Sequence, residues 1–410
     1  MKTAGIIAEY NPFHNGHYYH IEETRRLTGA DHVVVVMSGS FTQRGTPALI
    51  DKYTRTRMAL LGGADLVLEL PVLFSAGSAG DFAFGAVSLL DKLGAIDLIS
   101  FGSEAGSHDV LLEAAAILSR EPALFQDTLR TELQNGSSYA KARFAALNAV
   151  LPTPLPSGPN NLLGLEYCHA LIKRNSRILP FTITRQGAGY HDPAITGTMP
   201  SALSIRKYLE TSGDSGITDL LSASVPKEVL GLWEELTAGQ QFLFPSDFTK
   251  ELRYKLLCLA NEDLTVYADI TRELSDKIRK SSMHFSDWEH LCSLVKSKEL
   301  TYSRISRALC HILLDITAND LQTARDTDYV PYARILGFRK SAQPLLSQIK
   351  KNTRIPMISK LADAPGQLSP QALSVLQKDI SAAHICESVL AAKTGQPLRN
   401  EYTRQIVILP

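Results

Sequence analysis

Two histidines flank a glycine near the start of the chain. They are His14 and His17, on either side of Gly16, in the segment EYNPFHNGHYYH of residues 9–20. A short apolar run precedes this segment, and a helical pattern resumes near His17. Main-chain N–H groups at the start of a helix attract anions, and a glycine lets a phosphate approach the main chain. Two imidazoles at such a point can donate hydrogen bonds to phosphoryl oxygens as negative charge develops, so the arrangement suits nucleotidyl transfer.

The same segment offers a metal site as the alternative. His14, His17 and His20 are spaced three residues apart. Steps of three drift around a helix, and no carboxylate or cysteine nearby completes a tetrahedral set. We therefore predict no metal site, and His20 by itself reads as a packing or surface residue.

A second cationic element is expected to hold the leaving diphosphate. The segment PSALSIRKYL (residues 200–209) offers one, because Ser201 and Ser204 can cap a helix whose first turns carry Arg206. Taken alone, the segment is a helix start with surface charges. Together with the paired histidines it predicts the partner of a phosphate site, although the alanine and leucine between the serines cannot bind phosphate through their side chains.

Short β-branched apolar runs alternate with helical patterns in the first half of the chain. Strands are predicted at residues 3–8, 32–37, 65–70, 97–101 and 178–184, and helices at 17–27, 52–61 and 109–118. Units of strand, helix and strand form a parallel sheet with helices on both faces. We therefore predict an α/β fold with a Rossmann-like parallel sheet, whose ligand binds beyond the carboxyl ends of the strands.

The pattern changes after about residue 215. From residue 225 to 314 the apolar residues recur at helical spacing, with few strand-like runs. We predict two domains, residues 1–215 with the sheet and residues 216–410, which are mostly helical. Residues 186–201 are rich in Gly, Pro and Thr and predict a functional loop before the boundary.

The composition is that of an ordinary soluble protein. The 410 residues hold 42 Lys and Arg against 42 Asp and Glu, and 44% of them are hydrophobic. No uncharged apolar stretch approaches the roughly 18 residues of a membrane span. The five cysteines are odd in number and form no CxxC pair, which argues against a disulfide framework and a cysteine zinc site. A cytoplasmic location is therefore expected.

One stretch of this neutral chain is basic. Residues 321–360 carry eight Lys and Arg residues against two Asp residues. Such a run can follow a phosphate backbone, or it can be the solvated face of a helix. Charge alone leaves both interpretations open.

Several longer motifs resemble one family along nearly the whole chain. The histidine motif and the SALSIR helix start are similar to the HxGH nucleotidyltransferase superfamily, which includes pantetheine-phosphate and nicotinate-mononucleotide adenylyltransferases. More closely, the chain resembles the bacterial tRNA(Met) cytidine acetate ligase family. The matching segments are GIIAEYNPFHNGH (5–17), MSGSFTQRGTPALIDKYTR (37–55), GADLVLELP (63–71), FGSE (101–104), GPNNLLGLEY (158–167), RQGAGYHD (185–192) and YARILGF (332–338).

The resemblance implies a two-step reaction on elongator tRNA(Met). Acetate would attack the α-phosphorus of ATP to give acetyl-adenylate and diphosphate, and the acetyl group would pass to N4 of the wobble cytidine. Acetate is already anionic near neutral pH, so the first step needs positioning and charge stabilisation, with Mg²⁺ expected to help. The second step needs a proton acceptor, which no motif identifies. No membrane and no stable protein partner are implied, and residues 216–410 are expected to bind the tRNA.

The resemblance also implies the site residues. The catalytic residues would be His14, His17 and Arg206. The ATP contacts would be Ile7, Ala8, Glu9, Tyr10, Asn11, Pro12, Phe13, His14, Asn15, Gly16, His17, Tyr18, Tyr19, His20, Gly102, Asn161, Arg185, Gln186, Ser201 and Ser204. The tRNA contacts are predicted at Arg44, Lys52, Arg55, Arg334, Arg339, Lys340, Lys350 and Lys351.

Two other functions compete with this one. A small-molecule adenylyltransferase of the pantetheine-phosphate or nicotinate-mononucleotide type would need neither the helical second half nor the basic stretch. A non-catalytic RNA-binding protein would not need the intact histidine motif. A class I aminoacyl-tRNA synthetase is disfavoured because the chain contains no KMSKS string.

Overall fold

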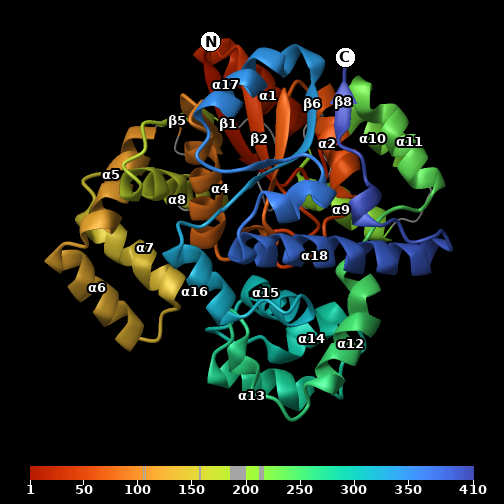
Figure 1. Cartoon of the computed structure of the whole chain (residues 1–410). Helices are drawn as coiled ribbons and strands as arrows, with labels where there is room; N and C mark the ends of the chain where they lie inside the picture. The colour runs from red at the N-terminus through yellow and green to blue at the C-terminus, as the bar shows by residue number, and fades with distance from the viewer. Residues whose placement is uncertain (105, 107, 157, 185–199, 212–216) are drawn as a thin grey trace.

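A mostly parallel sheet forms the centre of the molecule (Figure 1). The computed structural model describes residues 1–104, 106, 108–156, 158–184, 200–211 and 217–410. Within these ranges the strands are β1 (Thr3–Ala8), β2 (His32–Ser38), β3 (Leu66–Leu70), β4 (Leu98–Ser103), β5 (Leu179–Thr184), β6 (Ala333–Arg339), β7 (Met357–Ile358) and β8 (Val407–Leu409). Their order is β5-β4-β1-β2-β3-β6-β7, and β8 pairs with β6.

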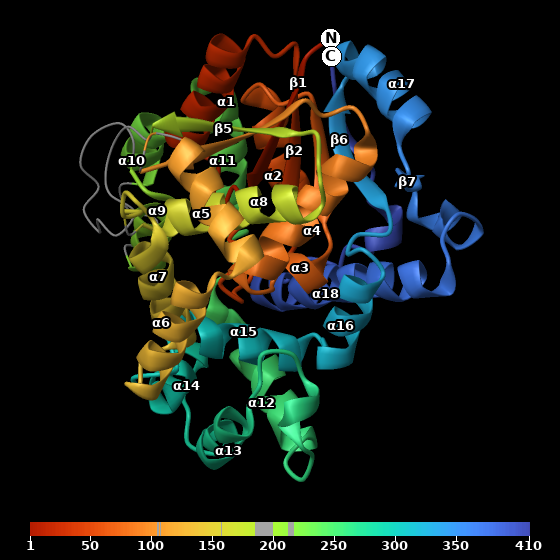
Figure 2. The same ribbon diagram turned by 90° about the vertical axis from the view of Figure 1, so that its left-hand side faces the viewer.

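Helices cover both faces of this sheet and extend below it (Figures 1 and 2). In the first half they are α1 (Asn15–Thr28), α2 (Lys52–Leu61), α3 (Val72–Ser75), α4 (Ala79–Leu93), α5 (His108–Arg120), α6 (Ala123–Gln134), α7 (Tyr139–Val150), α8 (Pro159–Lys173) and α9 (Ala202–Thr211). In the second half they are α10 (Ile217–Ser224), α11 (Leu230–Ala238), α12 (Thr249–Cys258), α13 (Arg272–Ser281), α14 (Trp288–Val295), α15 (Tyr302–Leu313), α16 (Ala318–Asp326), α17 (Gln343–Asn352) and α18 (Pro370–Thr394).

The first five strands confirm the predicted α/β fold. β1 pairs in parallel with both β2 and β4, β2 pairs in parallel with β3, and β4 with β5. The apolar run of β2 is buried from Val33 onward, as expected of a strand covered on both faces. The helix boundaries follow local signals as well, since Gly29 ends α1 in the left-handed conformation and Asp51 caps α2.

The second half contributes three strands that the helical pattern did not predict. β6 pairs with β3 in antiparallel orientation, and β7 and β8 pair with β6. The two halves of the chain therefore share one sheet. Because β6 is antiparallel, its first residues lie near the carboxyl end of β3, with Arg334 opposite Glu69. Its last residue, Arg339, lies at the amino end of β3, where its N–H donates to the Asp65 carbonyl at 2.9 Å.

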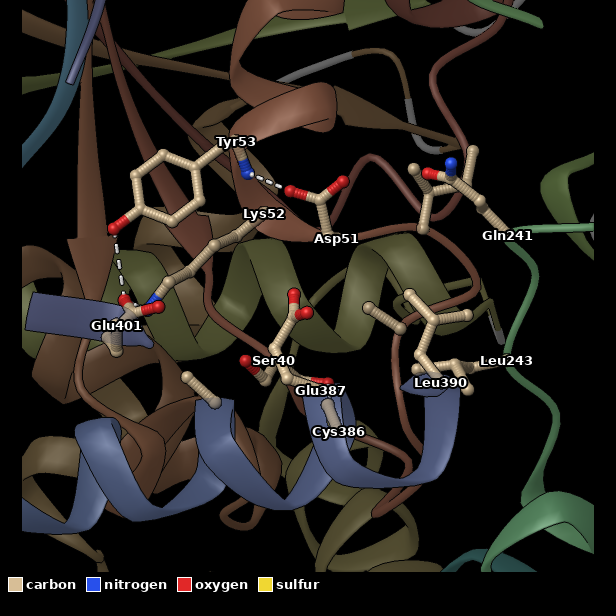
Figure 3. A pocket seen from close by; sticks show the side chains of 13 residues that line it. Ser40, Asp51, Lys52, Tyr53, Gln241, Leu243, Cys386, Glu387, Leu390 and Glu401 are labelled. Atoms are coloured by element: carbon tan, nitrogen blue, oxygen red, sulfur yellow. Dashed lines mark hydrogen bonds and ion pairs between the residues drawn. The ribbon is translucent and has the colours of Figure 1, made fainter. Parts of the chain in front are cut away.

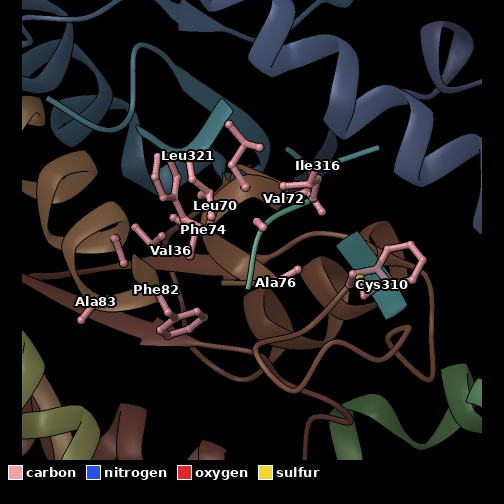
Figure 4. Close-up of a cluster of buried hydrophobic side chains, with 14 of the residues drawn as sticks. Val36, Leu70, Val72, Phe74, Ala76, Phe82, Ala83, Cys310, Ile316 and Leu321 are labelled. Carbon is pink, nitrogen blue, oxygen red and sulfur yellow. The ribbon is translucent and has the colours of Figure 1, made fainter. Parts of the chain in front are cut away.

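Helices α12–α16 pack against the sheet domain through a common core. Figure 4 shows Leu70, Val72 and Phe74 beside Ile316 and Leu321, and all five are buried in one cluster. α18 crosses beneath the sheet (Figure 1). In the part of the chain that the structure describes, no helix is both long and apolar enough to cross a membrane.

Candidate active site

A cavity of about 480 Å³ opens at the carboxyl ends of β1, β4 and β5. This is the position that a parallel α/β sheet predicts for its ligand. Its described lining comprises Ile7, Ala8, Glu9, Tyr10, Asn11, His14, Gly16, His17, Tyr19, His20, Gln43, Arg44, Ala79, Phe82, Phe101, Gly102, Pro159, Asn160, Leu162, Leu163, Tyr167, Ile183, Thr184, Ser201, Ala202, Leu203, Arg206 and Ser303. The cavity thus brings together segments from both halves of the chain.

The histidine motif forms the start of α1. His14 is the residue before the helix, and its Nδ1 accepts a hydrogen bond from the Gly16 N–H at 3.0 Å. A neutral His14 therefore carries its ring hydrogen on Nε2, where it can donate. The rings of His14 and His17 lie in contact, with centroids 3.9 Å apart. A Cβ atom on Gly16 would lie 2.8 Å from His14 Cε1, so this position needs a glycine.

The predicted cationic helix start is α9. Ser201 precedes the helix, and its Oγ accepts a hydrogen bond from the Ser204 N–H at 3.1 Å. Arg206 donates to the main-chain carbonyl of Asn11, which connects α9 to the loop after β1. Ser201 and Arg206 line the cavity, whereas Ser204 is buried and donates its hydroxyl to the Ser201 carbonyl.

Most of the predicted ATP contacts line this cavity, but some do not. Pro12, Phe13, Asn15, Tyr18, Asn161 and Ser204 lie outside its lining. Asn161 is buried, and its Oδ1 accepts from the Ser103 hydroxyl at 2.8 Å and from the Glu104 N–H at 3.0 Å. It therefore holds the end of β4 beside Gly102. Arg185, Gln186 and nearly all of the predicted loop of residues 186–201 lie outside the described residues.

One wall of the cavity is apolar and was not predicted from the sequence. It is formed by Phe82, Phe101, Leu162, Leu163, Tyr167 and Ile183. The rings of Phe101 and Tyr167 meet edge to face, with centroids 5.5 Å apart. Apolar residues on α4 and α8 have the spacing of core residues, so periodicity alone cannot mark them as cavity lining. The motifs of residues 101–104 and 158–167, which together contain four of them, were the available signal.

Arg55 lies beneath the cavity and fixes two strand ends. Its guanidinium and Nε donate to the carbonyls of Ile50, Glu9, Ser38 and Gly39. Burial lowers the pKa of Arg55 to about 10. Because Arg55 is fully buried, it cannot touch tRNA, and its predicted role in tRNA binding is wrong.

Lys52 and Arg334 are buried as well, so they too cannot contact tRNA in this structure. Lys52 Nζ lies 2.7 Å from both Glu69 and Glu401, and Arg334 lies 2.8 Å from Glu69 and 2.6 Å from Glu401. Two cations and two anions therefore compensate each other inside the protein, which buried charges require. Burial disfavours ionisation of Glu401, but Lys52 and Arg334 outweigh it and lower the pKa of that carboxyl to about 2.

Figure 3 shows the small cavity beside this network, between α2 and α18. Lys52, Tyr53 and Glu401 lie on one side, and the Tyr53 hydroxyl donates to Glu401 at 3.0 Å. Its volume of about 20 Å³ is enough for one water molecule. It therefore does not compete with the larger cavity as a substrate site.

The other predicted tRNA contacts fall into two places. Arg44 lines the large cavity. Arg339 ends β6, Lys340 follows it directly, and Lys350 and Lys351 lie on α17. This group lies toward the amino ends of β1–β3, and α17 is next to both termini in Figure 2. The last three are exposed. The antiparallel direction of β6 thus separates this basic group from the cavity by the length of the sheet.

Comparison with known proteins matches the whole chain to one group. The model of the HIGH Nucleotidyl Transferase family matches residues 1–401. A tRNA(Met) cytidine acetate ligase from Acetivibrio thermocellus is 39% identical over 415 residues, covering 100% of both chains. One from Thermoanaerobacter sp. is 40% identical and covers 94% of each chain.

Two solved structures have the same fold over the full length. The crystal structure of Thermotoga maritima TmcAL bound with alpha-thio ATP has a TM-score of 0.89 and 28% identity, with 100% of both chains covered. The apo form of the same protein has a TM-score of 0.90. Identity near 40% over the complete length, together with the paired histidines at the cavity, shows that the chain belongs to the tRNA(Met) cytidine acetate ligase family of HIGH nucleotidyl transferases.

Proposed function

We propose that this protein is an ATP-dependent ligase that acetylates N4 of the wobble cytidine of elongator tRNA(Met) through an acetyl-adenylate. The observation that carries the proposal is the cavity at the carboxyl end of β1, where His14, Gly16 and His17 form the start of α1. Full-length similarity to named tRNA(Met) cytidine acetate ligases supports the choice of substrate.

The described residues suit the adenylation step. The positive end of the α1 dipole and the His14 ring are proposed to interact with the phosphate oxygens. Arg206 adds a permanent positive charge at the same cavity. The apolar wall around Phe101 and Tyr167 suits a purine ring, and Gly102 lets it lie against the main chain. We propose that these groups hold ATP with its α-phosphorus facing the acetate.

Magnesium is proposed to arrive with the nucleotide. Among the described residues there is no group of three or more His, Cys, Asp or Glu side chains that could hold a metal ion. Mg²⁺ commonly keeps several waters and binds through substrate phosphates with few protein ligands. When bound there, it would neutralise phosphate charge during displacement.

The tRNA is proposed to approach the cavity where both halves of the chain line it. Arg44 from the first half and Ser303 from α15 both face this cavity. The distant group of Arg339, Lys340, Lys350 and Lys351 is proposed to hold a part of the tRNA away from the reacting base. Changing these four residues to Ala should weaken tRNA binding and flatten its salt dependence while acetate-dependent ATP–diphosphate exchange persists. Unchanged tRNA affinity would make them a solvated surface only.

One experiment tests the reaction class. The pure protein is incubated with ATP, radiolabelled acetate and total tRNA, and the RNA is digested to nucleosides. Label in N4-acetylcytidine supports the proposal, and its absence under conditions of ATP consumption refutes it. A small-molecule adenylyltransferase would instead release diphosphate with a phosphorylated metabolite and without tRNA or acetate.

A further inference from the structure

The acetyl transfer needs a proton acceptor beside the cytosine amino group. In that step N4 bonds to the acetyl carbon, the carbon–oxygen bond to AMP breaks, and AMP leaves with the electron pair. N4 must also lose one proton. AMP is a stable phosphate anion and needs no proton to leave, so a single base completes the balance.

Few groups in the cavity can be this base. Glu9 is the only carboxylate among the described residues that line it. Arg44 and Arg206 remain protonated, and tyrosine phenols are protonated near neutral pH. Burial raises the pKa of Tyr10 and of Tyr167 still further.

The histidines already make other contacts. Nδ1 of His14 already accepts the Gly16 N–H, so its other nitrogen is a donor. Nε2 of His20 lies 3.1 Å from the Ser100 hydroxyl. His17 is in ring contact with His14 at the start of α1, where the phosphates are proposed to bind.

Glu9 is held in place from two sides. Its main-chain carbonyl accepts a hydrogen bond from Arg55, and its Oε1 accepts the Gln43 N–H at 2.8 Å. Both contacts fix the residue just after β1. Gln43 and Arg44 belong to the loop that Ser306 of α15 fixes by donating to the Gly45 carbonyl at 3.1 Å. Glu9 is half-buried and lines the same cavity as Tyr167, and no hydrogen bond to its Oε2 is found among the described residues.

We propose that Glu9 is the catalytic base of acetyl transfer, accepting the N4 proton of cytidine on Oε2. This assignment rests on the proposed function and deepens it. The nitrogen becomes acidic only once it has bonded to the acetyl carbon, so a carboxylate is a sufficient base. The same carboxylate can accept a hydrogen bond from the amino group before attack and so favour cytosine over uracil, which lacks this donor.

The test separates the two half-reactions in Glu9→Gln. Gln keeps an oxygen for the Gln43 N–H but cannot take up a proton. Adenylation is measured as acetate-dependent ATP–diphosphate exchange, and transfer as single-turnover acetylation of elongator tRNA(Met). We expect the ratio of transfer rate to exchange rate to fall at least about 30-fold, since general-base catalysis contributes about 10²–10⁴-fold. Glu9→Asp should recover part of the ratio.

The matched control is Glu22→Gln on the exposed side of α1, which should leave the ratio unchanged. An equal loss of both half-reactions in Glu9→Gln would overturn the proposal and place Glu9 in adenylation. An unchanged ratio would also overturn it and make His17 the candidate base. The proposed function fails on a different observation, the absence of acetylcytidine with the unaltered protein.

Discussion

The substitution Gly16→Ala tests whether the position of His14 controls adenylation. The added Cβ would lie 2.8 Å from His14 Cε1 and 3.1 Å from its Nδ1. To regain ordinary van der Waals contact the ring must withdraw by about 0.6 Å. Such a movement stretches the 3.0 Å hydrogen bond from the Gly16 N–H beyond useful length. Loss of this helix cap costs about 1 kcal/mol, which a protein of this size tolerates.

The effect on catalysis should be larger than the effect on folding. A displacement of about 1 Å can cost roughly 100-fold in rate, so a shift of about 0.6 Å should reduce acetate-dependent ATP–diphosphate exchange about 10- to 100-fold. The control is Gly231→Ala in α11, where an added Cβ meets no atom within 4 Å. That variant should keep full exchange activity. If Gly16→Ala retained exchange within about 3-fold of the unaltered protein, the role given to His14 would be refuted.

Three further predictions concern buried charges. Arg55→Met leaves four carbonyls without their donor and should lower the free energy of unfolding by about 3 kcal/mol or more in denaturant titrations. The control Arg57→Met, at an exposed position of the same helix, should change it little. Equal effects of the two substitutions would contradict this reasoning. Glu401→Gln leaves an uncompensated buried cation and should cost about 3 kcal/mol at pH 7. The folded pKa of Glu401, about 2, is below the ordinary 4.5, so its contribution is complete above pH 4.5 and is lost as the pH falls toward 2; a cost that is the same at pH 3 as at pH 7 would count against the network. Burial, and next the charge of Glu69, raise the pKa of Asp379 to about 7. The folded protein therefore holds this proton more tightly than the unfolded chain, and the resulting stabilisation is lost as the pH rises from 3.8 to 7. The free energy of unfolding of Asp379→Asn, relative to that of the unaltered protein, should therefore rise by about 4 kcal/mol between pH 4 and pH 8. If the free energies of unfolding of the two proteins changed in parallel across this range, the shift would be ruled out.

Much of the site could be predicted from the sequence because several of its contacts join residues that are close together in the chain. The run before Glu9 is buried strand, and the helix after His14 begins where the sequence breaks. His14, Gly16 and His17 interact within four residues of one another, so their geometry follows from one strand end and one helix start. The helix start at Ser201 follows in the same way from its cap.

The apolar wall and the proposed base were harder to identify. Phe82, Tyr167 and Ile183 have the spacing of core residues, and only the packing of α4, α8 and β5 around a cavity distinguishes them. The sequence predicted Glu9 only as one of the ATP contacts. It becomes a candidate base once the structure shows which other polar residues line the cavity and which contacts they make.

By itself, the sequence determined the parallel α/β core, the helical character of most of the second half and the histidine-bearing start of α1. Hydrophobic periodicity, helix caps and strand-breaking residues act over a few positions, and the chain displays them directly. Tertiary structure alone decided which cations face solvent. Lys52 and Lys350 are the same chemical group, yet Lys52 is buried against Glu69 and Glu401, the latter 349 positions away in the chain, while Lys350 is exposed. The antiparallel pairing of β6 adds Arg334 opposite Glu69. Burial depends on such distant contacts because a charge leaves water only where an opposite charge compensates it.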